Sequence, residues 1–116
     1  MSLVELRSPT HQLHSDRFAH SAATAAMTPI AINSRVFIPA NTAAANELNE
    51  FFYQSEVTGP ALGGEAWAVG DKIYWDAANS RFTKTAGALP VCGYATQPKP
   101  SADTVSPRFF FNSFAA

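Results

Sequence analysis

The sequence predicts an all-β protein, either a small β-sandwich or a barrel, with an extended N-terminal arm. From residue 29 onward, short segments rich in β-branched and aromatic residues alternate with Pro, Gly and Asn, which is typical of strands and turns. No long amphipathic helix and no repeat of about 20 to 50 residues is evident. The 116 residues have the length of a single domain.

The first 28 residues are expected to form the arm. They are rich in Ser, Ala, Thr and His and contain few large apolar side chains to bury. Residues 19–27 have a helix-forming composition but are too short to make a stable helix alone. We therefore expect residues 1–28 to become ordered on a partner and residues 29–116 to form the β-rich domain.

Two strand regions are expected in the first half of the domain. Residues 29–39 fit either one strand or two short strands joined by a tight turn. Residues 48–57 fit a strand that carries Phe51, Tyr53 and Val57 on one face.

The second half of the domain predicts a hairpin and two further strands. Residues 71–76 and 81–85 flank a turn, so Trp75 is expected to point inward beside an aromatic partner on the opposite strand. Residues 91–96 and 108–113 supply the other two strands, on either side of a Pro-rich loop.

The composition argues against several classes of protein. A formal net charge of -1 gives no electrostatic field that would gather nucleic acid. With one cysteine, Cys92, the chain forms no intrachain disulfide, and the thiol is expected to be packed and inert. No apolar run approaches the roughly 20 residues that cross a bilayer, and we expect neither a signal peptide nor a membrane partner.

The segment AWAVGDKIYWD, residues 66–76, is the clearest motif. A glycine permits the turn that leads into a strand, and the following aspartate can accept local backbone N–H groups. The two indoles are large enough to organise much of a small core. The residues that we expect to define the fold are Trp67, Gly70, Asp71, Tyr74, Trp75 and Asp76.

With the later segments NSRFT and VCGYAT, this motif resembles the phage capsid decoration, or cement, proteins. The resemblance covers about residues 56–96. It implies a β-sandwich or β-tulip-like module on the outer surface of an icosahedral shell, made in the host cytoplasm, that binds the major capsid protein and clamps its subunits together. We expect no enzymatic activity and no cofactor. A homo-oligomer, either a dimer or a trimer, is also expected.

The contact residues are expected at the two ends of the chain. The C-terminal RFFFNSFAA places rings on both faces of a strand, so one face either meets a neighbour or is buried within the domain. The candidate capsid or subunit contacts are Leu3, Leu6, Leu13, Phe18, Phe109, Phe110, Phe111 and Phe114.

Carbohydrate or host-surface binding is the alternative function, with Trp67, Tyr74 and Trp75 as an aromatic platform. Alternation along a strand puts neighbouring rings on opposite faces, which weakens this alternative. The three histidines lack the spacing and the additional ligands of a metal site, so no metal is expected. No serine has the sequence context of a hydrolase nucleophile.

Overall fold

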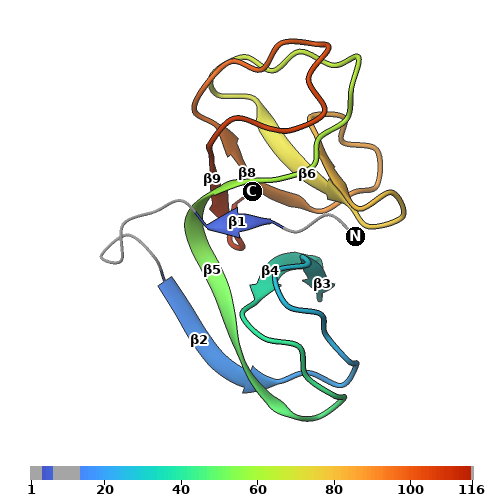
Figure 1. The fold of residues 1–116 in the computed structure, drawn as a ribbon, viewed down its shortest axis with the longest axis vertical. Coiled ribbons are helices and arrows are strands. Elements are labelled where there is room, and N and C mark those ends of the chain that lie inside the picture. Colours follow the sequence, from blue (N-terminus) through green and yellow to red (C-terminus); the bar gives the residue numbers. More distant parts are fainter. Residues whose placement is uncertain (1–3, 7–13, 116) are drawn as a thin grey trace.

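The computed structural model describes residues 4–6 and 14–115, which form one curled antiparallel sheet shaped as a half-barrel (Figure 1). No helix occurs in these residues, so the all-β prediction is confirmed. Seven strands follow the order β3-β4-β5-β9-β8-β6-β7, and β1 and β2 pair with β5. The strands are β1 (Glu5–Leu6), β2 (His14–Ala19), β3 (Ile30–Ile32), β4 (Arg35–Pro39), β5 (Leu48–Thr58), β6 (Lys72–Asp76), β7 (Arg81–Thr83), β8 (Val91–Ala95) and β9 (Phe109–Asn112).

The long strand β5 is the spine of the sheet. Phe52 pairs with both Ser15 of β2 and Ile38 of β4, so β2 and β4 lie on opposite edges of β5. Further along, Val57 pairs in the same way with β1 and with β9. Figure 1 shows β5 running from the lower half of the molecule, beside β2, into the upper half. It therefore connects the two halves.

A β-bulge at Tyr53 changes which side chains face the core. The pairing of β2 passes from Phe52 to Gln54 and skips Tyr53. One extra residue reverses the alternation of side chains, so Phe52 and Val57, on either side of the bulge, both pack against the main core. Phe51 is absent from that core and faces the other side of the sheet, so the prediction that Phe51, Tyr53 and Val57 share one face is wrong.

Residues 29–39 form two strands rather than one. β3 and β4 pair as a tight hairpin in which Ile32 lies opposite Arg35. Its two turn residues, Asn33 and Ser34, have φ of 50° and 70°. Positive φ at both central positions is the hallmark of a type I′ turn, whose twist matches that of the flanking strands.

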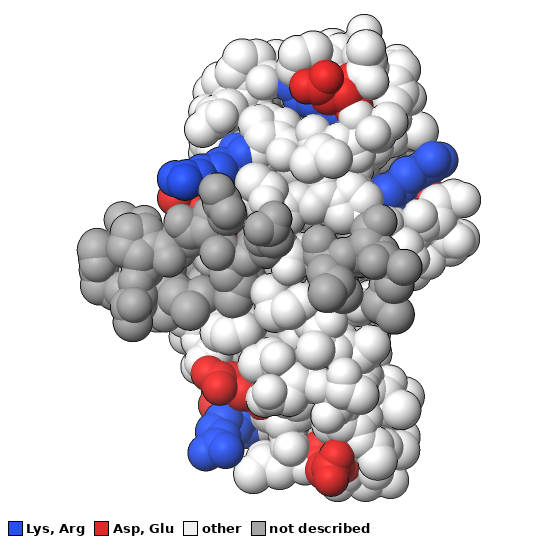
Figure 2. Space-filling view, in the orientation of Figure 1, with Lys and Arg blue, Asp and Glu red and all other residues white. Residues whose placement is uncertain are grey.

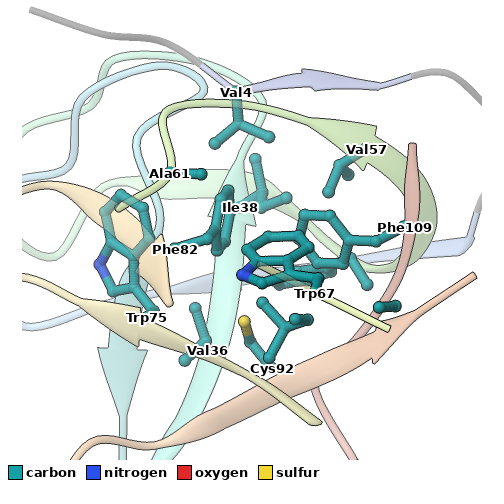
Figure 3. Close-up of a cluster of buried hydrophobic side chains, with 13 residues drawn as sticks. Val4, Val36, Ile38, Val57, Ala61, Trp67, Trp75, Phe82, Cys92 and Phe109 are labelled. Carbon is teal, nitrogen blue, oxygen red and sulfur yellow. The ribbon is translucent and has the colours of Figure 1, made fainter. Parts of the chain in front are cut away.

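The main core lies inside the curl of the sheet (Figure 3). Phe82 is its central ring: it packs edge-to-face on Trp75 and on Phe109, with both centroid distances 4.8 Å. Trp67 packs edge-to-face on Phe109 at 5.8 Å. Trp75 and Phe82 lie directly opposite each other in β6 and β7, so the predicted hairpin and its aromatic pair are confirmed.

The N-terminal segment differs from the expected arm. Residues 14–19 form β2 on the edge of β5, Val4 lies buried in the main core, and residues 19–27 contain no helix. Sequence patterning missed β2 because its order comes from hydrogen bonds to a distant strand rather than from an apolar stripe. Residues 5–6 and 14–19 therefore pair with β5 of the same chain.

Candidate functional site

The motif at residues 66–76 builds the fold rather than a surface site. Gly70 has a φ of 93°, and Asp71 N donates to Ala68 O at 3.0 Å, which closes the turn into β6. The Asp71 carboxylate accepts from Ala68 N at 2.8 Å and lies 3.9 Å from the ammonium of Lys84. Tyr74 and Asp76 alternate with the buried residues of β6 and are half-buried.

Glu65, directly before the motif, is a buried hub with 8% of its surface exposed. Its carboxylate accepts from Trp67 Nε1 at 3.0 Å, from Lys84 N at 2.7 Å, and from the hydroxyls of Thr83 and Thr85 at 2.9 and 2.8 Å. Burial of this carboxyl raises its pKa, but these hydrogen bonds favour the charged form and together hold the pKa below its ordinary value. Glu65 thereby ties the motif to the end of β7.

Lys99 is the second internal charge, with 1% of its surface exposed. Its Nζ donates to the carbonyls of Leu62 at 3.0 Å, Glu65 at 2.6 Å and Pro100 at 3.3 Å, and it lies 5.8 Å from the centroid of the Trp67 ring. Its three protons thus have three acceptors. No carboxylate in the described part of the chain forms an ion pair with it.

These two charges fix a pair of loops, residues 59–70 and 97–107, which run side by side at the top of Figure 1. Both charged groups are buried, and most of the described surface in Figure 2 belongs to residues other than Lys, Arg, Asp and Glu. The loops join through backbone hydrogen bonds from Ser106 N to Gly59 O, Ala61 N to Thr104 O, Gly64 N to Ser101 O, and in both directions between Trp67 and Lys99.

A second group of rings lies outside the main core, and we call it the aromatic surface cluster. Phe51 is fully buried at its base and stacks on Phe18 of β2 with centroids 4.2 Å apart. Phe37 of β4 meets Phe18 edge-on at 5.7 Å. Because β2 and β4 flank β5, their rings reach Phe51 from both sides. The cluster consists of His14, Phe18, Phe37, Phe51, Tyr53 and Phe114.

Among the Phe and Tyr rings of the cluster, Phe114 is the most exposed, with 55% of its surface exposed. It packs edge-on against Phe37 at 6.2 Å and Tyr53 at 5.8 Å, and the guanidinium carbon of Arg35 lies 4.9 Å from its centroid. Large side chains that are partly exposed yet held in place are typical of protein interfaces. This cluster is therefore the candidate contact surface.

Among the expected contact residues whose side chains are described, Phe114 is exposed and the others are buried or half-buried. Phe109 and Phe111 are fully buried in the main core and have no surface to offer a neighbour, which corrects their assignment as contact residues. Phe18 and Phe110 are half-buried, and Phe110 faces away from that core. Leu3 and Leu13 lie outside the described residues, and only the backbone of Leu6 is described.

The platform of the carbohydrate alternative does not form. Trp67 and Trp75 are 3% and 2% exposed, so neither indole presents a face to a sugar. Cys92 is fully buried, and burial raises the pKa of its thiol well above the ordinary value, as expected for a packed cysteine. Residues 4–6 and 14–115 contain no group of three or more His, Cys, Asp or Glu that could hold a metal, and no helix that could span a membrane.

Sequence reasoning missed the residues that organise these sites. Phe37 alternates with the apolar residues on either side of it, a signal that its ring faces away from the main core. Glu65 and Lys99 stand alone in long stretches of uncharged residues, which was a weaker signal of internal charges. Arg35 gave no signal, because its contact with Phe114 spans most of the chain.

Comparison with known proteins gives one match. The model of the phage cement protein family matches residues 10–109, which include the motif and every strand from β2 to β8. Neither a curated protein nor a solved structure matches the chain.

Proposed function

Because the chain belongs to the phage cement protein family, we propose that it is a structural protein of the virion that binds the outer surface of a phage capsid. There it stabilises contacts between major capsid subunits. The family match is the observation that carries this proposal. Two structural features support it: the loops of residues 59–70 and 97–107, which Glu65 and Lys99 hold in place, and the exposed aromatic surface cluster.

The mechanism is mechanical and needs no enzymatic chemistry. Each copy makes modest contacts with the shell, and symmetry repeats those contacts many times, so their sum raises the barrier to rupture. Loops that are already fixed lose little conformational entropy when they bind. The loops held by Glu65 and Lys99 meet this requirement.

The residues proposed to make capsid or subunit contacts are those whose surfaces remain accessible. Phe18, Phe110 and Phe114 retain exposed surface. Leu3, Leu6 and Leu13, whose side chains the structure does not describe, stay in the proposed set because of their place in the N-terminal segment.

The test is co-sedimentation of the purified protein with capsid shells that lack it, followed by heating with and without the protein. We expect the protein to pellet with the shells and to raise the temperature at which they rupture. Shells that already carry the protein are the control, because their sites are occupied and they should bind no more. Failure to pellet, or an unchanged rupture temperature, would contradict the proposal.

A further inference from the structure

Phe114 and Arg35 together form a fixed, exposed knob. Phe114 N donates to Asn112 Oδ1 at 2.9 Å, and Arg35 Nη1 donates to the Ser113 carbonyl at 3.3 Å. The buried Ser113 hydroxyl donates to the carbonyl of Val36, so the segment that carries Phe114 is bound to β4. The ring therefore projects into solvent with little freedom to lose, which favours its use as an anchor.

Arg35 brings a positive charge to the knob. It is exposed directly after the tight turn of the β3–β4 hairpin, and it forms no ion pair with any residue that the structure describes. A guanidinium has five N–H donors in a planar fork that suits a carboxylate. A surface that receives the knob should therefore combine an apolar recess with a carboxylate.

The same chain carries such a surface elsewhere. An open recess of about 210 Å³ lies beside the β6–β7 hairpin and is lined mainly by apolar atoms, with Leu62, Ala86 and Leu89 among its residues. Cavities of about 150 Å³ in proteins already accept a benzene ring, so this recess has room for a phenyl group. It shares no residue with the knob.

Asp76 is also one of the residues that line this recess. Its Oδ2 accepts from Asn79 Nδ2 at 2.8 Å and lies 3.8 Å from Arg81 Nε. That Nε has no hydrogen-bond partner in the described part of the chain, so the ion pair is loose. Oδ1 remains available for a further donor.

We propose that this protein associates with itself by inserting the Phe114 ring of one copy into the recess of a second copy, where Arg35 pairs with Asp76. Arg35 and Asp76 carry opposite charges, and the recess has the volume to hold a phenyl ring. Arg81, which already lies 3.8 Å from the Asp76 carboxylate, is the like charge that Arg35 meets there. The contact joins two different surfaces, so two reciprocal contacts give a dimer, whereas head-to-tail repetition gives a ring or an open filament according to the rotation between copies. This association does not depend on the proposed binding to a shell.

Sedimentation of the full chain, up to about 1 mM, tests the proposal, because a Kd in that range corresponds to only about 4 kcal/mol. Phe114→Ala removes the ring and Ala86→Phe fills the recess from within; each should weaken self-association about tenfold or more. The matched controls are Leu48→Ala, another exposed apolar residue, and Arg108→Gln, another exposed arginine. Both controls should associate as the wild type does.

Mixing the two variants is the sharper measurement. Phe114→Ala keeps an intact recess and Ala86→Phe keeps an intact knob, so the mixture should form mixed pairs at concentrations at which each variant alone is mostly monomeric. Arg35→Glu should weaken association, and salt should weaken the wild type more than it weakens Arg35→Glu. A monomeric wild type, equal loss in the controls, or a mixture without mixed pairs overturns the proposal. Circular dichroism of each variant identifies any that fail to fold. If Phe114→Ala or Arg35→Glu fails to fold, Arg35→Gln replaces it.

Discussion

Replacing Glu65 by alanine should destabilise the protein by about 2 to 5 kcal/mol, because each buried donor left without an acceptor costs about 1 to 3 kcal/mol. Two of the groups that donate to the Glu65 carboxylate, Trp67 Nε1 and Lys84 N, are fixed by the fold and cannot rotate toward another acceptor. Lys84 N is only partly buried and contributes at the low end. The hydroxyls of Thr83 and Thr85 can rotate to other acceptors and add little. The loss is a large part of the roughly 5 to 15 kcal/mol by which a domain is usually stable.

Urea unfolding followed by tryptophan fluorescence measures this loss. The matched control is Glu47→Ala, because the exposed carboxylate of Glu47 accepts one hydrogen bond, from Ala44 N at 2.9 Å. We expect this control to lose less than about 1 kcal/mol, as substitutions of exposed residues usually do. Equal losses in the two variants would refute the assignment of Glu65 as a buried hub.

The same carboxylate makes stability depend on pH. The pKa of Glu65 is lower in the folded chain than its ordinary value of 4.5, so the folded state favours the ionised form. Its contribution is fully present above pH 4.5 and is lost as the pH falls through the lowered pKa of the folded state. The difference in unfolding free energy between wild type and Glu65→Gln should therefore be largest near neutral pH and shrink in acid. A difference that stays constant with pH would contradict the lowered pKa.

Three further predictions test the turns and the packing of the fold. Gly93→Ala should lower the free energy of unfolding by about 3 kcal/mol or more, measured by urea unfolding. A Cβ at this position would lie 2.1 Å from the Phe110 carbonyl oxygen of the paired strand. Normal stability of the variant would contradict that close approach. Ser34→Gly should stabilise the protein by about 0.5 kcal/mol. Ser34 has a positive φ, which strains a serine but not a glycine, and the relief of this strain exceeds the extra conformational entropy that glycine gives the unfolded chain. A lower melting temperature of the variant would contradict this prediction. Trp67→Phe should cost about 1 to 3 kcal/mol more stability than Trp75→Phe. The Trp67 indole N–H donates to the buried carboxylate of Glu65, whereas the Trp75 indole N–H has no partner in the described chain. Equal unfolding midpoints of the two variants would show that the Trp67 hydrogen bond adds nothing to stability.

Local patterns in the sequence predicted much of the fold. The β6–β7 hairpin was readable because Trp75 and Phe82 are close in sequence and separated by turn residues. The turn at Gly70 was readable because glycine is favoured wherever φ must be positive. Features that depend on neighbouring residues therefore leave a signal in the sequence.

Long-range features left no such signal. β2 is polar and exposed and owes its order to β5, and the bulge at Tyr53 arises from a mismatch between two paired strands. The candidate contact surface depends on both features, because β2 brings Phe18 onto Phe51. Sequence reasoning therefore chose Phe18 and Phe114 but could not assemble the cluster around them.

The ammonium of Lys99 performs the task that a bound metal ion performs in many loop-rich proteins, where a cation gathers several backbone carbonyls. A metal ion can dissociate, and its loops then depend on the composition of the surrounding solution. The cation in this chain is covalently part of it. Chelators and dilution therefore cannot remove it.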